Sequence, residues 1–418
     1  MKINRTKLKN GANLTAINMP DTLTITLLIM LKSGPRFDPI NKEGLSHFVE
    51  HLMMDWSDKL SDKNEILRIL ESEGIVTGAF SYQETNIYWM RGMKTSLSLM
   101  SKILINQIQN PLFRIEDIKT EKQIVLEEWK IVNDNPESII WENWAKNVWQ
   151  GSSLGRSYIG DKKTIKNFTR RDVLNYFKSY YLPINMEYVV CGDILVDDAA
   201  LIIENNLEIK EKKIKPKILP IVVKRTNPIN ITYKKTNGLT VAYGFLTTMM
   251  SDDSVVLELI ENILGGGWSS LLRQKIAQKG LTYSIECYSR NLSDTGYLMN
   301  MFTCDKKNLN RIISVINSQL KLIKCGKLEQ SIIDRAKGYF KGSIILNNEK
   351  SDDLANWFAY QQIANPKNVL SLSEKCEKIQ NITNEEIVRV ASKYFTNKNW
   401  YLSVIGLLEE RDIKVNVE

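Results

Sequence analysis

The two histidines of the 418-residue chain, His47 and His51, lie four residues apart with Glu50 between them. The apolar residues around them recur at helical spacing, so the segment Glu43–Met54 is predicted to form a helix. Because residues three and four apart share one face of a helix, both imidazoles can bind the same metal ion. Two imidazoles suit zinc, and a catalytic zinc normally takes three protein ligands and one water. Glu50 is then the candidate general base for that water, and the alternative is a pair of stacked histidines without a metal.

A third ligand would have to come from elsewhere in the chain. The segment Arg114–Val132 is predicted to be a long amphipathic helix, on which Glu121 and Glu128 lie two turns apart on one face. Glu128 could complete a His-His-Glu site, and Glu121 could act as a second acceptor that orients a histidine ring. Glutamates on a helix are more often solvated, and their spacing alone does not select Glu128.

His-x-x-Glu-His is the inverted form of the zinc-protease signature, and the sequence here resembles the pitrilysin/insulinase family of zinc metallopeptidases. Within that family it resembles the half-size members that are similar to the mitochondrial processing peptidase. The separation of His51 from Glu128 matches the family spacing between the second histidine and the third ligand. The resemblance therefore implies one zinc ion per chain, held by His47, His51 and Glu128, with Glu50 as general base. Four further matches lie in the first half: Thr6–Thr15, Gly78–Tyr88, Glu121–Glu128 and Gly155–Gly160.

The resemblance also implies where a substrate binds. The strand around Val76–Tyr82 would present a sheet edge, to which an extended peptide adds through main-chain hydrogen bonds. Gly78, Ala79 and Phe80 are the candidate substrate-binding residues on this strand. The family usually has Asn at the position of Gly78, so this chain lacks one side-chain contact to the scissile region.

An internal repeat predicts two homologous domains. The segment Asp172–Gly192, a predicted helix and apolar strand, recurs as Glu386–Gly406 with a constant offset from its first to its last residue. We predict a first domain over 1–208 with the zinc site, a Lys- and Pro-rich linker over 209–228, and a second domain over 229–418 without a metal site. The mixture of alternating and helical patterns predicts an α+β fold class. By resemblance, each domain is a largely antiparallel sheet with helices packed on one side.

The second half contains no histidine, so it cannot copy the metal site. Family members carry an Arg and a Tyr there, two helical turns apart in sequence, which contact the substrate. Tyr283 matches the Tyr, but Ile276 stands in place of the Arg, and Arg273 is one turn further back. Two chains form the chamber in half-size members, so the loss of the Arg favours a heterodimer with a homologous subunit over a homodimer.

Composition narrows the class of protein. The chain is 43% hydrophobic and 25% charged, which is ordinary for a globular protein, and it has no apolar run long enough to predict a membrane span. No signal or transit peptide is recognised at the N-terminus. Five cysteines without Cys-x-x-Cys spacing favour a reducing cytoplasm. The net charge of +8 is dispersed, and the lysine-rich stretch fits a solvated linker better than a nucleic-acid-binding arm.

These observations favour a zinc endopeptidase that acts on short or unfolded peptides, including precursor or leader segments. A non-catalytic structural or peptide-binding subunit of the same fold is the first alternative, although such members usually lose the His-x-x-Glu-His residues. A peptide-binding module with a structural zinc is weaker still, because structural zinc sites tend to be rich in cysteine.

Overall fold

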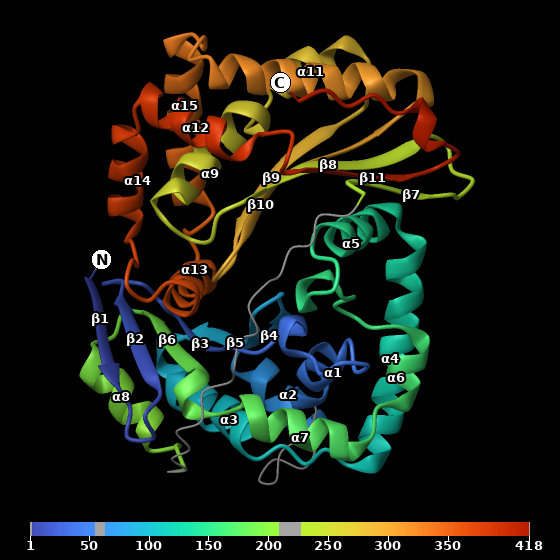
Figure 1. The fold of residues 1–418 in the computed structure, drawn as a ribbon. Coiled ribbons are helices and arrows are strands. Elements are labelled where there is room, and N and C mark those ends of the chain that lie inside the picture. The colour runs from blue at the N-terminus through green and yellow to red at the C-terminus, as the bar shows by residue number, and fades with distance from the viewer. Residues whose placement is uncertain (1, 55–62, 209–226, 418) are drawn as a thin grey trace. The chain divides into compact units, whose positions relative to one another are not determined.

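The computed structural model describes residues 2–54, 63–208 and 227–417, which form two compact units, each built on its own sheet (Figure 1). The first unit comprises Met1–Ile131, Arg156–Leu219 and Asn347–Val369, and the second comprises Val132–Gly155, Pro220–Leu346 and Leu370–Glu418. The predicted α+β class is confirmed. None of the helices in the described ranges is both long and apolar enough to cross a bilayer.

The first unit contains a six-stranded sheet in the order β1-β2-β6-β3-β5-β4. Its pairs are antiparallel except for the parallel pair of β2 with β6. The central strands are apolar on both faces and buried, whereas β4 lies at the edge of the sheet. The strands are β1 (Lys2–Lys7), β2 (Asn13–Asn18), β3 (Thr24–Leu31), β4 (Val76–Ser81), β5 (Asn86–Met93) and β6 (Met186–Gly192).

Most helices of the first unit cover one face of this sheet, and a single helix, α13 (Ser351–Ala364), covers the other (Figure 1). Ser351 and Asp352 of α13 bond to Thr26 of β3 and Arg91 of β5, at 2.8 and 2.6 Å. The remaining helices are α1 (Leu45–Met53), α2 (Lys63–Ser72), α3 (Leu97–Gln109), α4 (Ile115–Asp134), α6 (Lys162–Asn167), α7 (Arg170–Tyr180) and α8 (Val196–Glu204).

The second unit repeats this plan with five strands in the order β7-β11-β8-β10-β9. Here α5 (Pro136–Val148) is the single helix on one face, where its Trp144 is fully buried and donates a hydrogen bond to the carbonyl of Tyr401 at 3.2 Å. The strands are β7 (Ile229–Thr232), β8 (Leu239–Thr247), β9 (Ile285–Asn291), β10 (Gly296–Cys304) and β11 (Trp400–Ile405). The other helices are α9 (Asp252–Gly265), α10 (Leu271–Lys275), α11 (Leu309–Lys324), α12 (Gln330–Leu346), α14 (Leu372–Asn381) and α15 (Asn384–Tyr394).

The compact units differ from the predicted division at two segments. The helix α5 precedes the predicted linker but packs on the second sheet, and α13 follows the linker but packs on the first. Both sheets are apolar on both faces, so each needs a helix on its second face, and the chain supplies it from the other half. The linker over 209–228 lies outside the described residues except for its last two positions.

The predicted repeat is present as the units α7–β6 and α15–β11. Thr169 and Thr383, which occupy equivalent positions of the repeat, each begin their helix with a capping box, closed by Asp172 and Glu386 respectively. A cap of this kind satisfies backbone N–H groups that have no partner within the helix. The same local sequence thus fixes the same helix start in both halves.

Replacing Trp144 by Ala should weaken the second unit, although Trp144 precedes the predicted linker. Loss of this buried side chain is expected to lower the free energy of unfolding by about 3–5 kcal/mol. Hydrogen exchange should then accelerate in β8 and β11. The crosswise variant Phe358→Ala, in the fully buried part of α13, should accelerate exchange in β3 and β6 instead. The opposite pattern would contradict the assignment of these helices.

Candidate metal centre

The helix α1 carries the His-x-x-Glu-His segment, and its N-terminus is fixed by two local features. Gly44 adopts a left-handed conformation with φ 86°, where a Cβ atom would lie 2.2 Å from the carbonyl oxygen of Ile159. The buried carboxylate of Asp38 accepts hydrogen bonds from the backbone N–H groups of Gly44 and Ser46 at 2.7 and 2.8 Å. Burial raises the pKa of Asp38 to about 8, against the effect of these two bonds. The start of α1 is thereby held in one place.

The two imidazoles of α1 converge with carboxylates from α4. The Nε2 atoms of His47 and His51 lie 3.3 Å apart. The carboxylate of Glu128 lies 3.7 Å from Nε2 of His47 and 3.4 Å from Nε2 of His51. Glu121 accepts a hydrogen bond from Nδ1 of His51 at 2.7 Å. The structure therefore brings together the three predicted ligands and the predicted orienting residue.

Glu50 belongs to the same cluster. One carboxylate oxygen of Glu50 and one nitrogen from each of His47 and His51 all lie within 4.8 Å of one another. Two imidazole nitrogens and carboxylate oxygens that converge in this way form a donor set that suits zinc. The Nδ1 atom of His47 is buried and has no hydrogen-bond partner among the described residues. No acceptor therefore orients the His47 ring through Nδ1, as Glu121 orients the ring of His51. These residues fit a divalent cation.

The histidines titrate in opposite directions in the absence of a cation. Burial, and then repulsion by His51, lower the pKa of His47 to about 4. Burial also lowers the pKa of His51, but its contacts with Glu121, Glu128 and Glu50 outweigh this effect and raise the pKa to about 10. One proton thus stays on His51 near neutral pH, where its positive charge is surrounded by carboxylates. Because a metal cation must displace this proton, metal affinity is expected to rise with pH.

The two carboxylates beside the histidines also differ. Burial raises the pKa of Glu50 to about 7, because it outweighs the attraction of His51 and a hydrogen bond from Ser81. Burial acts in the same direction on Glu128, but the hydrogen bond to His51 and the charge of His47 lower the pKa of Glu128 overall. Glu128 is therefore the more readily ionised of the two, as a ligand requires. Glu50 has the higher affinity for a proton, as a general base requires.

The candidate substrate-binding residues Gly78, Ala79 and Phe80 lie on β4, which is the edge strand of the first sheet as predicted. A Cβ atom at position 78 would lie 2.8 Å from the indole of Trp89. A larger residue at position 78 would therefore require the Trp89 ring to move. Phe80 is half exposed and packs near Tyr82, with ring centroids 6.5 Å apart.

The sequence analysis missed Ser81, the last residue of β4. Its hydroxyl donates a hydrogen bond to Oε2 of Glu50 at 3.3 Å. Strand alternation places Thr77, Ala79 and Ser81 on the face of β4 that points toward α1. That signal was available from the sequence, but the strand-to-helix distance was not.

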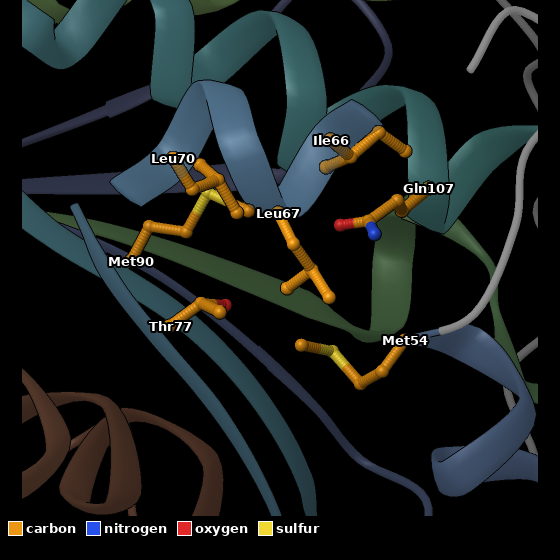
Figure 2. Close-up of a pocket in the computed structure, with 7 residues that line it drawn as sticks. All are labelled: Met54, Ile66, Leu67, Leu70, Thr77, Met90 and Gln107. Carbon is orange, nitrogen blue, oxygen red and sulfur yellow. The ribbon is translucent and has the colours of Figure 1, made fainter. Parts of the chain in front are cut away.

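A cavity of about 150 Å³ lies beside the same face of β4 (Figure 2). Strands β4 and β5 contribute Thr77 and Met90 to its lining, and helices α2 and α3 contribute the others except Met54, which follows α1. Its lining is mostly apolar and comprises Met54, Ile66, Leu67, Leu70, Thr77, Met90 and Gln107.

The predicted substrate residue of the second unit, Tyr283, is fully exposed. It lies between Gly280, which has a left-handed conformation, and the start of β9. Ile276, which replaces the family Arg, is fully buried. The guanidinium of Arg273 lies over the ring of Trp268, 4.7 Å from its centroid.

The second unit has a counterpart of the metal centre with different chemistry. The strand registers place Ser289 of β9 at the position of Ser81, and its backbone N–H donates to Glu261 of α9 at 3.0 Å. Glu258, Glu261 and Asn262 of α9 have the same spacing as His47, Glu50 and His51 of α1. Arg335 of α12 donates to the carbonyl of Asn262 at 3.1 Å. Lys375 pairs with Glu258 at 2.7 Å, so positive side chains lie in this cluster.

Comparisons with known proteins agree with this division. Residues 14–162 match the family model described as insulinase (peptidase family M16), and residues 167–339 match the model described as the peptidase M16 inactive domain. His47, His51, Glu121 and Glu128 lie in the first match. Glu258, Glu261, Asn262 and Arg335 lie in the second match.

Similar proteins extend over nearly the whole chain. An uncharacterized zinc protease of Rickettsia felis is 26% identical over 402 residues, covering 94% of this chain and 95% of that protein. The mitochondrial-processing peptidase subunit beta of Mus musculus is 22% identical and covers 97% of this chain and 84% of its own.

Two solved structures share the fold. The crystal structure of a protease from Helicobacter pylori has a TM-score of 0.88 at 20% identity, covering 97% of this chain and 99% of that one. A chain of complex III2 from Candida albicans has a TM-score of 0.84 at 18% identity, covering 98% and 97%.

Substituting Glu121 by Gln should weaken metal binding. The neutral amide is a poorer acceptor for the Nδ1–H of His51, so the ring is held less firmly and its Nε2 becomes less basic. We expect the affinity for zinc to fall about 10- to 100-fold, measured by competition with a chromogenic chelator. Glu127→Gln is the matched control, because Glu127 is exposed on the same helix and pairs with Lys130. Equal zinc affinity in both variants would contradict the orienting role of Glu121.

Proposed function

Because the chain belongs to the insulinase family of peptidases, family M16, we propose that it is a zinc-dependent endopeptidase that hydrolyses short or unfolded peptides. The observation that carries the proposal is the convergence of His47, His51 and Glu128 beside the buried carboxylate of Glu50. Relatives named as zinc proteases support the choice of metal. Precursor or leader segments fit such a substrate class, since they are extended and lack a packed core.

In this proposal His47, His51 and Glu128 hold one zinc ion, and Glu121 orients His51. When bound, the ion would supply Lewis-acid chemistry. Glu50 would accept a proton from the attacking water and later deliver it to the leaving amine. Its raised pKa suits both steps, because a group that binds a proton with intermediate affinity can also release it.

The substrate would bind to the open edge of β4 in an extended conformation. Main-chain groups of Gly78, Ala79 and Phe80 would pair with the peptide backbone, which tolerates many side-chain sequences. Ala79 and Ser81 point to the side of α1, so a peptide added at this edge would run past Glu50. The adjacent apolar cavity could accept one apolar side chain of the peptide.

We further propose that the chain works as one subunit of a dimer, preferably with a homologous chain. The family Arg is replaced by Ile276, and the guanidinium of Arg273 is already stacked on Trp268. Tyr283 alone remains available for substrate. A partner that keeps both Arg and Tyr would supply the missing cation.

A reducing cytoplasm is the proposed compartment. All five cysteines are free, and Cys191, Cys287 and Cys304 are buried. Burial raises the pKa of each of these three thiols and keeps them in the unreactive protonated form. An oxidising compartment would favour paired cysteines.

A non-catalytic subunit is the alternative, and the similarity of fold to a chain of complex III2 is compatible with it. The His-x-x-Glu-His segment argues against this alternative, because a scaffold gains nothing from a buried carboxylate beside two imidazoles. The following variant separates the two functions.

Glu50→Gln should abolish hydrolysis while zinc still binds. The amide cannot accept a proton, so kcat on an unfolded model peptide is expected to fall about 10²- to 10⁴-fold. Zinc content, measured by mass spectrometry of the metal, should remain one per chain because Glu50 is not a proposed ligand. A zinc-loaded wild type that cleaves no peptide even with its homologous partner present, or a Gln variant as active as wild type, would refute the peptidase function.

The purified chain alone should be a poor peptidase. Adding a homologous chain that carries the Arg and Tyr pair should raise kcat/KM about 10²-fold, the magnitude typical of one transition-state hydrogen-bond donor. Size-exclusion chromatography with light scattering should show a heterodimer at the same time. Full activity of the chain as a homodimer would exclude the need for a different partner.

A further inference from the structure

Ser81 connects the edge strand to the candidate general base. Its hydroxyl lies 3.3 Å from Oε2 of Glu50 and 3.2 Å from Oδ1 of Asn86. A hydroxyl carries one proton, so it donates to one of these oxygens at a time, and an ionised carboxylate is the stronger acceptor of the two. Among the described residues Ser81 is the one side chain outside the metal cluster that contacts the Glu50 carboxylate through a hydrogen bond.

The support for Ser81 is itself rigid and buried. Asn86 is fully buried and donates through Nδ2 to the carbonyl of Ser46 at 3.1 Å and to the hydroxyl of Tyr181 at 3.3 Å. The hydroxyls of Tyr181 and Tyr88 lie 2.6 Å apart. This chain of bonds joins β4, β5, the C-terminal end of α7 and the start of α1. Buried networks in which each member has a partner hold their groups in one geometry.

We propose that Ser81 is a positioning residue that fixes the orientation of the Glu50 carboxylate for catalysis. This inference rests on the proposed function and names a residue that the proposed mechanism does not use. A glutamate side chain can rotate about its terminal bond, so a hydrogen bond to Oε2 decides which oxygen faces the water. With Oε2 held by Ser81, Oε1 is the oxygen left to accept the proton.

The location of Ser81 adds a second consequence. It ends the strand at which the peptide would add, and it faces the same side as Ala79. The base is thereby bonded to the same strand that would align the scissile peptide, and both move together. A misplacement of about 1 Å between base and substrate can cost about 10²-fold in rate.

The second unit shows that this bond is specific to the first. There Glu261 accepts its bond from the backbone N–H of Ser289, and the Ser289 hydroxyl is buried without a hydrogen-bond partner in the described part of the chain. Removing the hydroxyl of Ser289 therefore removes no contact to Glu261. Ser289→Ala is the matched control for Ser81→Ala, with the same chemical change at the corresponding position.

The test uses the full zinc-loaded chain, with its partner subunit if one is needed for activity. Ser81→Ala should lower kcat about 10- to 100-fold, the range for loss of one hydrogen bond to a charged group. KM and zinc affinity should stay within about twofold, because neither the edge strand nor a ligand has changed. Ser81→Thr keeps the hydroxyl and should restore kcat, and Ser289→Ala should leave kcat unchanged.

A structural readout tests the same idea without turnover. In high-resolution crystal structures of the zinc-loaded protein, the Glu50 carboxylate should have one orientation in wild type and in Ser81→Thr, and several in Ser81→Ala. An unchanged single orientation in Ser81→Ala overturns the inference whether or not the protein is active. A loss of zinc affinity in Ser81→Ala also overturns it, because Ser81 would then act on the ligands. If the wild type is inactive but the orientation of the Glu50 carboxylate depends on Ser81, the peptidase function is refuted while the positioning role is supported.

Discussion

The site depends on the approach of two imidazoles to carboxylates brought from a distant helix. Two Nε2 atoms 3.3 Å apart in a mostly buried place can share a proton or a metal cation, and Glu121 and Glu128 of α4 supply the opposite charge. Without a cation, a proton on His51 takes that role, as its raised pKa indicates. A protonated His51 would be strongly disfavoured in a purely apolar setting, since burying an unpaired charge costs several kcal/mol. The pairing of α1 with α4 is thus the contact on which the chemistry rests.

The remaining parts of the first unit hold this contact in a fixed position relative to β4, where a substrate would bind. Asp38 holds the start of α1, and the central strands provide a rigid base that is buried on both faces. Ser81 links the base residue to the edge strand β4. The site therefore lies where a fixed helix meets an unpaired strand, which lets a single geometry serve both the chemistry and the binding of a backbone. The second unit has a comparable helix and strand, α9 and β9, but the positive charges beside that helix belong to the side chains of Lys375 and Arg335. A metal ion cannot replace these covalently attached charges.

Much of this could be predicted from the sequence, for identifiable reasons. The spacing of His47, Glu50 and His51 on one helix depends only on local geometry, so the cluster on α1 was predictable. Glu128 could not be chosen from helical periodicity, because a solvated glutamate has the same pattern; only the family spacing selected it. Ser81 was missed because alternation along β4 gives the face of a residue but not the helix opposite to it. The Gly78 departure was visible in the sequence, while the close contact of this position with the indole of Trp89 on a neighbouring strand was not.

The placement of α5 and α13 could not be predicted, because an apolar helix fits either of two sheets that are apolar on both faces. The placement of these two helices also limits how the chain can be divided into separate polypeptides. A gene split within 209–228 would give two products, each with one apolar sheet face bare and one orphan helix that belongs to the other product. Such fragments could fold only when both are present. Each half therefore depends on a helix that the other half supplies, so the repeat that is modular in sequence is not modular in structure.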